Sequence, residues 1–160
     1  MQLILAAIGR LKKGPEQDLV ARYSDRLTKA GKAIGITQFK TIEIVESRAS
    51  SADARKRDEA QSILSRLPDN CAIFAFDERG KSPNSRQFAQ LVSRELESGS
   101  PSLALIIGGP DGLDSSVKDR ASRLISFGSA TFPHQLVRVL VLEQVYRATT
   151  ILTNHPYHRD

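Results

Sequence analysis

The sequence predicts one α/β domain over residues 1–160, with a single open, mostly parallel sheet flanked by helices. Two observations predict this fold class. Five segments of strand length alternate along the chain with five segments that carry apolar residues at helical spacing, which is the order expected of a parallel sheet built from βαβ units. Residues 71–76 and 103–107 are continuous apolar runs, as expected for strands that are covered on both faces.

The first half of the chain contains two predicted strands and two predicted helices. Residues 3–8 are apolar and end at a glycine, which indicates a buried first strand. Pro15 then begins a helix that extends to about residue 32, because proline at a first helical position loses no needed hydrogen bond. Residues 37–45 alternate like a half-buried strand. A helix over residues 52–67 follows a pair of serines that can cap it.

The middle of the chain repeats the order of strand and helix. Residues 71–76 form an apolar strand that is expected to end before a polar loop at residues 77–81. A helix over residues 86–97 follows, with Asn84 or Ser85 as its cap. A crossover helix of this kind allows the flanking strands to run parallel.

The second half contains shorter elements and then one long helix. Residues 103–107 form an apolar strand that ends at the glycine-rich segment 108–112. A short helix is predicted over residues 115–122, and a short strand over residues 124–127. The final helix is predicted over residues 133–153, where apolar residues recur without interruption.

The final helix is apolar nearly all round its surface. Pro133 marks its start, and Thr131 can cap it. A helix with apolar residues on several sides is expected to be buried on more than one of them. One side can pack on the protein's own sheet and another on a second copy, because two-fold homodimers are the commonest oligomers. The sequence therefore predicts a homodimer.

Three loops are expected to meet at one edge of the sheet. They follow Phe76, Ile107 and Phe127, and the carboxyl ends of strands in open α/β sheets are where ligands bind. The glycines of segment 108–112 indicate either backbone at positive φ or close approach to a partner. A tight turn without a ligand explains the same glycines equally well.

Several familiar motifs are incomplete in this chain. Gly80-Lys81-Ser82 lacks the earlier glycine of a phosphate loop, because Ala75 occupies that position. Segment 108–112 lacks the spacing of a dinucleotide fingerprint. No G-x-S-x-G elbow is present, which argues against a serine hydrolase of that class. The histidines are not spaced with cysteines as zinc ligands are, so no metal is expected.

Charge and composition are those of an ordinary globular protein. The net charge is +5, with 26% charged and 40% apolar residues, which leaves open both a nucleic acid partner and none. Cys71 is the single cysteine and lies in an apolar run, which indicates a buried thiol and a reducing compartment. Signal-peptide anatomy and a run long enough to span a membrane are both lacking, so we expect a soluble, cytoplasmic protein without a membrane partner.

The carboxyl-terminal stretch contains all three histidines, which are His134, His155 and His158. The chain ends with Tyr157, His158 and Arg159 before the last residue. An aromatic ring, an imidazole and a guanidinium together suit a binding or catalytic site. The alternative is a frayed, disordered terminus.

Five motifs in order carry a resemblance to a known family. They are Phe76-Asp77-x-x-Gly80-Lys81, Ile106-Ile107-Gly108-Gly109-Pro110-x-Gly112, Thr131-Phe132-Pro133-His134-Gln135-x-x-Arg138-Val139, Glu143-Gln144-Val145-Tyr146-Arg147-Ala148 and Pro156-Tyr157-His158-Arg159. The chain resembles, essentially from end to end, the ribosomal RNA large subunit methyltransferase H family. Its members belong to the SPOUT superfamily of S-adenosylmethionine-dependent methyltransferases.

The resemblance implies a homodimer whose carboxyl-terminal part forms a deep trefoil knot, a feature that periodicity alone would never indicate. It also implies that S-adenosyl-L-methionine binds in the knot. The residues implied to hold it are Phe76, Gly108, Phe127, Gly128, Ser129, Ala130, Thr131 and Phe132. Position 76 is often leucine in the family, so Phe76 is expected to change the packing around the methyl donor without abolishing its binding.

The implied reaction is methylation at N3 of a pseudouridine in 23S ribosomal RNA. By this resemblance His158 is the expected general base for the N3 proton. Arg147 and Arg159 are expected to hold phosphate or the carbonyl groups of the pyrimidine, and Tyr157 is expected to stack on a base. We expect the tail of one subunit to complete the site of the other.

His134 and Arg138 lie one turn apart at the start of the last helix, where they are expected to shape the site or the dimer. An appended RNA-binding domain is not apparent, so the assembled ribosome or large subunit is expected to supply the remaining contacts. Two alternatives stay open. One keeps the fold and the methyl donor but acts on another RNA uridine or a ribose, and the other is an α/β module that senses a nucleotide or another ligand without catalysis.

Overall fold

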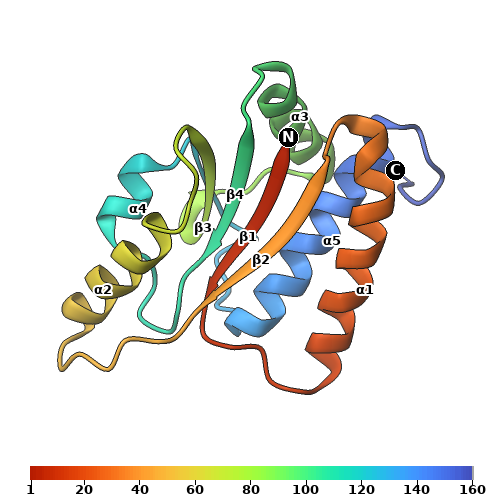
Figure 1. The fold of residues 1–160 in the computed structure, drawn as a ribbon. Helices are drawn as coiled ribbons and strands as arrows, with labels where there is room; N and C mark the ends of the chain where they lie inside the picture. Colours follow the sequence, from red (N-terminus) through yellow and green to blue (C-terminus); the bar gives the residue numbers. More distant parts are fainter. Residues whose placement is uncertain (160) are drawn as a thin grey trace.

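The computed structural model describes residues 1–159 and contains one sheet with helices on both faces (Figure 1). Within these residues the sheet has five parallel strands in the order β2-β1-β4-β3-β5. The strands are β1 (Gln2–Ile8), β2 (Gln38–Ile44), β3 (Cys71–Lys81), β4 (Ser102–Ile107) and β5 (Arg123–Ile125). The predicted α/β class with a parallel sheet is confirmed.

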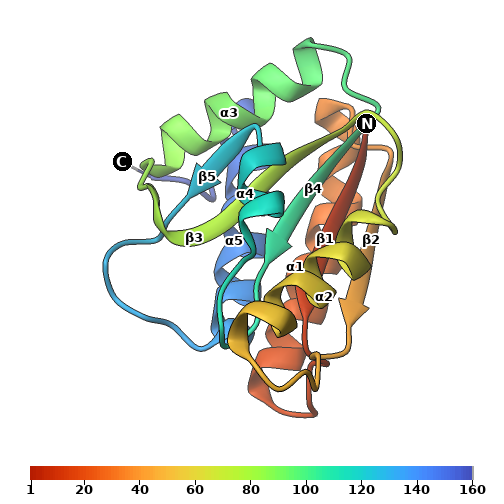
Figure 2. The same ribbon diagram turned by 90° about the vertical axis from the view of Figure 1, so that its left-hand side faces the viewer.

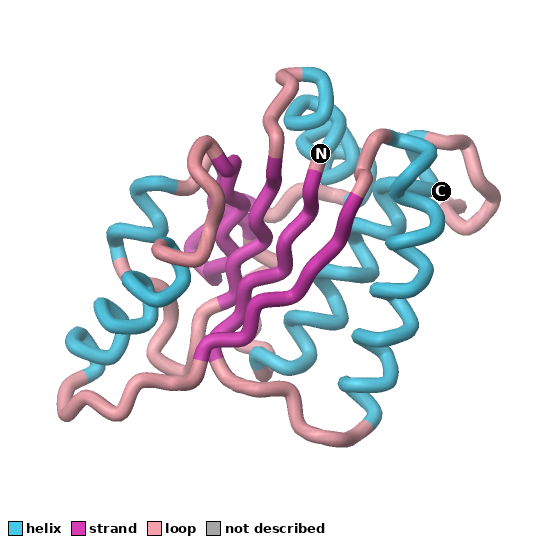
Figure 3. Tube along the Cα trace, viewed as in Figure 1, coloured by secondary structure: helices cyan, strands magenta, loops and turns pink. Residues whose placement is uncertain are grey.

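The helices form two layers, one on each face of the sheet. They are α1 (Pro15–Ala30), the short 3-10 helix η1 (Gly31–Ile34), α2 (Ala52–Leu64), α3 (Ser85–Glu97), α4 (Ser115–Arg120) and α5 (His134–Leu152). Helices α1, α3 and α5 cover one face, whereas α2 and α4 cover the other (Figure 2; Figure 3). Helix α5 lies between α1 and α3 and contacts both.

The strand β1 shows how the sequence pattern places a core on each face. Leu3 and Leu5 point to the layer of α1, α3 and α5, whereas Ile4 and Ala6 point to the layer of α2 and α4, because successive side chains of a strand alternate. All four side chains have no exposed surface. The apolar run therefore reflects burial on both faces, as predicted.

The predicted end of β3 at Phe76 was wrong. The strand continues to Lys81, with a shift of register beyond Phe76, and Lys81 pairs with Ile125 of β5. Beyond Phe76 the strand has left its partner β4, which ends at Ile107 opposite Phe76. Its polar side chains are consequently mostly exposed, and a polar edge extension resembles a loop in the sequence.

Other differences are confined to the ends of elements. Helix α1 changes to η1 at Gly31, and Gly35, with φ of 92°, ends that turn. Helix α4 ends at Arg120, and β5 covers residues Arg123–Ile125 rather than 124–127. Phe127 therefore lies in the loop that follows β5.

Helix α5 is buried on more than one side, as predicted, and its buried residues include Arg138, Thr149 and Thr150 as well as apolar side chains. Near its start, Phe132 and Leu136 each keep 39% of their surface exposed. Among the described residues, no helix combines the length and apolar character that crossing a bilayer requires. The trefoil knot and the second copy stay predictions.

Candidate functional site

A cavity of about 760 Å³ lies at the carboxyl ends of the strands. Its walls come from the end of β3, the loops after β4 and β5, and the first residues of α5. Of the eight residues implied to hold the methyl donor, seven line this cavity. These are Phe76, Gly108, Phe127, Gly128, Ala130, Thr131 and Phe132. Ser129 lies in the same loop but does not line the cavity.

Two phenylalanines form an aromatic wall of the cavity. The rings of Phe76 and Phe127 stack with centroids 5.5 Å apart and an interplanar angle of 14°. Phe76 is buried, whereas Phe127 is partly exposed. The phenylalanine at position 76 therefore packs against the loop after β5, and its ring supports that loop where the cavity begins.

The glycine loop after β4 is packed too closely to accept larger residues. A Cβ atom on Gly109 would lie 2.9 Å from Cγ2 of Ile8, and one on Gly108 would lie 3.0 Å from the carbonyl carbon of Gly112. Gly112 has φ of 83°, and its N–H donates to the oxygen of Gly109 over 3.0 Å. The glycines thus make a tight turn, and the turn also lines the cavity.

An ion pair holds the glycine loop against α2. The guanidinium of Arg55 donates from Nε to Oδ2 of Asp111 over 2.6 Å and from Nη2 to Oδ1 over 2.9 Å. The same guanidinium donates from Nη1 to the oxygen of Ala49. This pairing holds the pKa of Asp111 below its usual value.

Glu59 is a buried carboxylate that the sequence analysis missed. Only 4% of its surface is exposed, and its Oε1 accepts a hydrogen bond from the N–H of Ser47 over 2.9 Å. Burial raises the pKa of this carboxyl. Its spacing of four residues from the buried Ile63 could have indicated the position, because residues i and i+4 share one face of a helix.

A second ion pair lies at the rim of the cavity. Nζ of Lys118 is 3.2 Å from Oδ2 of Asp77, and both residues line the cavity. Oδ1 of Asp77 accepts a hydrogen bond from the N–H of Arg79 over 3.0 Å. The rim therefore offers fixed charges of both signs, whereas the wall behind it is apolar.

The start of α5 connects the cavity to the ends of β1 and β2. His134 lines the cavity, and Arg138 is buried beneath it. Arg138 donates to Oε1 of Glu43 over 2.6 Å and to the backbone oxygens of Ile8 and Gly9 over 2.9 and 2.6 Å. Arg138 thus shapes the site by joining three elements, and its guanidinium is not available to a ligand.

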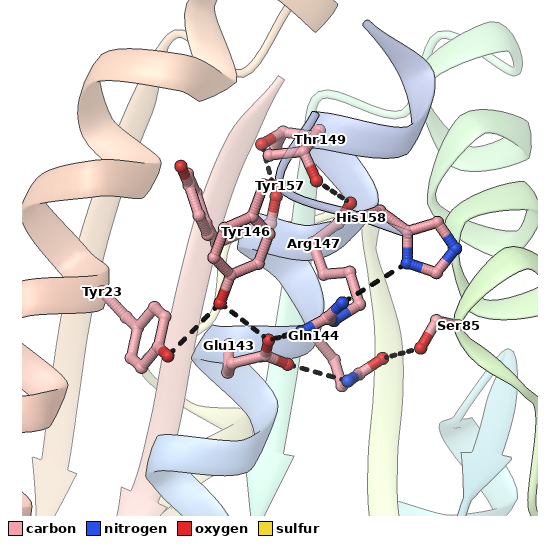
Figure 4. A network of polar contacts seen from close by, with 10 residues as sticks. Tyr23, Ser85, Glu143, Gln144, Tyr146, Arg147, Thr149, Tyr157 and His158 are labelled. Atoms are coloured by element: carbon pink, nitrogen blue, oxygen red, sulfur yellow. Dashed lines mark hydrogen bonds and ion pairs between the residues drawn. The ribbon is translucent and has the colours of Figure 1, made fainter. Parts of the chain in front are cut away.

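The carboxyl-terminal tail folds back on the second half of α5, where Tyr157 and His158 make side-chain contacts, so these two residues are not frayed (Figure 4). The hydroxyl of Tyr157 donates to Oε1 of Glu143 over 3.0 Å and lies 3.4 Å from the hydroxyl of Tyr23. Burial, followed by these two contacts, raises the pKa of Tyr157 above its usual value of 10.0. Tyr157 is therefore a hydrogen-bond donor at neutral pH.

Arg147 links Glu143 to His158. Its guanidinium donates to the carboxylate of Glu143, and this hydrogen bond raises the pKa of Arg147. The guanidinium carbon also lies 4.9 Å from the ring centre of Tyr157. Nη1 of Arg147 is 3.3 Å from Nδ1 of His158. Because arginine only donates, Nδ1 accepts, and a neutral His158 carries its proton on Nε2.

One chain does not bring the tail and the cavity together. His134 lies at the first position of α5 and Arg147 in its last turns, which corresponds to a separation of roughly 20 Å at a helical rise of about 1.5 Å per residue. Arg159 is exposed beside the tail. Within the described residues no group of three or more histidine, cysteine, aspartate or glutamate residues could hold a metal ion.

Comparison with known proteins identifies close relatives along the whole chain. The profile of a family described as predicted SPOUT methyltransferase matches residues 1–158. A ribosomal RNA large subunit methyltransferase H from Rhizobium leguminosarum bv. trifolii is 51% identical over 159 residues, which is 99% of each chain. A protein with the same description from Allorhizobium ampelinum is 50% identical over 160 residues, which is 100% of each chain. Another from Xanthobacter autotrophicus is 48% identical over 159 residues, which is 99% of each chain.

Proposed function

We propose, from the premise that this chain belongs to the ribosomal RNA large subunit methyltransferase H family of SPOUT methyltransferases, that it transfers a methyl group from S-adenosylmethionine to N3 of a pseudouridine in 23S ribosomal RNA. The observation that carries this proposal is the cavity at the carboxyl ends of the strands. It collects seven of the eight residues that the family resemblance implies for the methyl donor.

The residues of the cavity fit S-adenosylmethionine in size and chemistry. A volume of about 760 Å³ lies within the usual range of small-ligand pockets. The stacked rings of Phe76 and Phe127 offer an apolar wall for a flat purine, and the glycine loop leaves its backbone accessible because Gly108 has no side chain. S-adenosylmethionine supplies a methyl group that its sulfonium already activates. The protein therefore contributes mainly placement, which is worth up to about 7–11 kcal/mol.

The tail supplies the groups that act on the RNA in this proposal. His158 takes up the N3 proton as general base, a role worth about 10² to 10⁴-fold in rate. Nδ1 of His158 faces Arg147. His158 can therefore act as the base only after the substrate replaces Arg147 as the partner of Nδ1. Arg147 and Arg159 hold phosphate or pyrimidine carbonyls. Tyr157 stacks on a base only if the base displaces its contacts with Glu143 and Arg147.

A homodimer unites the two parts of the site. The cavity lies at the start of α5, whereas the tail contacts the second half of this helix. A second copy related by a two-fold axis, with its α5 antiparallel to this one, would bring each tail to the other cavity. Phe132 and Leu136, each 39% exposed at the start of α5, offer apolar surface for that contact. In this proposal the loops around the cavity also carry the trefoil knot of the family.

The substrate is the assembled ribosome or large subunit, and the reaction is accordingly cytoplasmic. One sheet and its helices account for the described residues 1–159, and no separate RNA-binding domain lies among them. A surface this small cannot select one nucleotide of naked RNA, so the folded particle must supply further contacts. Comparable methylation of protein-free RNA and of intact particles would contradict this part of the proposal.

The decisive test of the substrate is mass mapping of 23S ribosomal RNA. RNA from a strain that lacks the gene should lack one methyl group on a pseudouridine, and expression of this chain should restore it. A methyl group restored at a uridine or on a ribose would assign a different substrate. Binding of S-adenosylmethionine without any methyl incorporation would favour a sensing module.

The base assignment has a separate test. Single-turnover methyl transfer by His158→Ala should be slower than in the wild type by about 10² or more. Tyr157→Phe serves as a comparison within the same tail because it leaves the imidazole in place. An unchanged rate for His158→Ala across pH would show that His158 is not the base.

A further inference from the structure

The loop between β1 and α1 is a compact group of cations without an acidic residue. Residues 9–14 have the sequence GRLKKG, and Arg10, Lys12 and Lys13 are all exposed. Within the part of the chain that the structure describes, none of the three takes part in an ion pair. Their charge is therefore available to an anionic partner.

The protein holds this loop in place from two sides. The N–H of Leu11 donates to Oε1 of Glu43 over 2.9 Å, and the N–H of Gly9 donates to the oxygen of Ile44 over 2.7 Å. Arg138 donates to the oxygen of Gly9 over 2.6 Å. A loop fixed in this way presents its cations with little further loss of backbone entropy when a partner binds.

The loop lies next to the cavity. Gly9 has φ of 83°, and a Cβ atom there would lie 3.4 Å from Nε2 of His134, which lines the cavity. In Figure 1 the loop leaves the lower end of β1 and passes beside the start of α5. Arg79, an exposed cation, lines the cavity from the side of β3. Glu46 is the acidic residue nearest Gly9, at 3.0 Å from the same Cβ position.

We propose that Arg10, Lys12 and Lys13 form a phosphate-binding rim that grips the RNA backbone beside the target nucleotide. This inference rests on the proposed function, because it assigns the rim to the RNA that enters the cavity. Lysine and arginine bind phosphates without regard to base, and such contacts fix the register of a nucleic acid on a protein. The rim thus helps a protein without a separate RNA-binding domain to orient its substrate.

The test is a triple variant that removes three positive charges, Arg10→Gln with Lys12→Gln and Lys13→Gln. The matched control is Lys32→Gln with Arg66→Gln and Arg94→Gln, which removes the same charge from exposed sites. These three lie before β2, β3 and β4, at the opposite edge of the sheet. Both variants should keep the melting temperature and the affinity for S-adenosylmethionine of the wild type.

The triple variant at positions 10, 12 and 13 should have a KM for the large subunit that is higher by about tenfold or more at a salt concentration of about 0.15 M. The dependence of log affinity on log salt should become shallower by up to about 3 for three lost phosphate contacts. The control variant should match the wild type. Equal losses in both variants, or no loss in the first, would overturn the proposal.

Binding must also be measured without catalysis, by cosedimentation of the protein with large subunits. If the wild type binds particles and the rim variant does not, the rim is supported even where no methyl transfer occurs, and only the proposed reaction fails. If the rim variant changes its oligomeric state in analytical ultracentrifugation, the loop belongs to a contact between copies and the proposal is wrong.

Discussion

At the scale of single residues, the ring of Phe76 joins the cavity to the core. It stacks on Phe127 at 5.5 Å, and such aromatic pairs contribute about 0.5–1.5 kcal/mol beyond the area they bury. Because the ring supports the loop after β5 rather than a single ligand atom, a leucine at this position should weaken the site without destroying it.

Phe76→Leu should therefore lower the free energy of unfolding by about 1–2 kcal/mol and weaken S-adenosylmethionine binding by less than about tenfold. Urea unfolding and isothermal titration measure the two effects. Phe74→Leu is the control, because Phe74 is fully buried against Phe88 and does not line the cavity. It should lose stability and keep its affinity. Complete loss of binding in Phe76→Leu would contradict this account.

Tyr157 should ionise at a higher pH than an ordinary tyrosine. Its pKa is raised above 10.0 by burial and by its contacts with Tyr23 and Glu143. Above pH 10.0 the unfolded chain therefore loses this proton before the folded chain does, and the folded state loses stability as pH rises. Tyrosinate absorbance, compared between the wild type and Tyr157→Phe, isolates this phenol. A midpoint at or below 10.0 would show that the tail is detached in solution.

Residue types at strand ends could be predicted from the sequence, but charge pairs could not. The eight residues implied to hold the methyl donor lie at or after the ends of predicted strands, and all but Ser129 line the cavity. The pairs Arg55–Asp111 and Asp77–Lys118 join residues 56 and 41 positions apart. The order of strands in the sheet sets those separations, and no local pattern in the sequence records it.

At the scale of elements, the contact between β3 and β5 positions the loop that lines the cavity. A Cβ atom on Gly80 would lie 2.6 Å from the backbone of Ile125, so only glycine permits this approach. The loop 126–132 begins one residue later. The register of the two strands therefore decides where Phe127 and its neighbours lie.

Gly80→Ala should cost about 1–3 kcal/mol of stability and should also weaken S-adenosylmethionine binding, because β5 must move. Gly99→Ala is the comparison. Gly99 has φ of 74° and open space around it, so alanine there is strained by about 1–2 kcal/mol but lies at the far edge of the sheet. Wild-type affinity in Gly80→Ala would contradict the proposed positioning of the loop.

Periodicity predicted the existence and type of the elements, but it did not predict where each of them ends. The extension of β3 to Lys81 is exposed and polar, since it has a partner strand on one side only. Its residues are polar because they face solvent rather than a core, and a polar segment of this kind predicts a loop. Glycine is required at position 80 because the backbone of Ile125, 45 residues later, lies against it.

At the scale of the whole molecule, the proposed site is divided along helix α5. The cavity lies at the start of α5, the tail contacts Glu143 and Arg147 in its second half, and no residue of the described tail lines the cavity. A single copy therefore holds two separate parts of the proposed site. Neither composition nor periodicity could place a tail relative to another copy. Apart from the family resemblance, only the apolar surface of the last helix indicated an assembly.

The measurement that tests this claim most directly mixes two inactive variants. Ala130→Trp fills the cavity from an exposed loop position and is chosen for loss of S-adenosylmethionine binding. His158→Ala removes the imidazole of the tail. Each variant alone should keep about 1% of wild-type activity or less on large subunits. After subunit exchange, the mixture should recover about a quarter of wild-type activity, because half of the dimers are mixed and each has one intact site.

Recovery on mixing would mean that the tail of one copy completes the cavity of another. A mixture that forms mixed dimers, as verified by differently tagged copies, and yet stays inactive would show that each chain uses its own tail, and it would contradict the central claim.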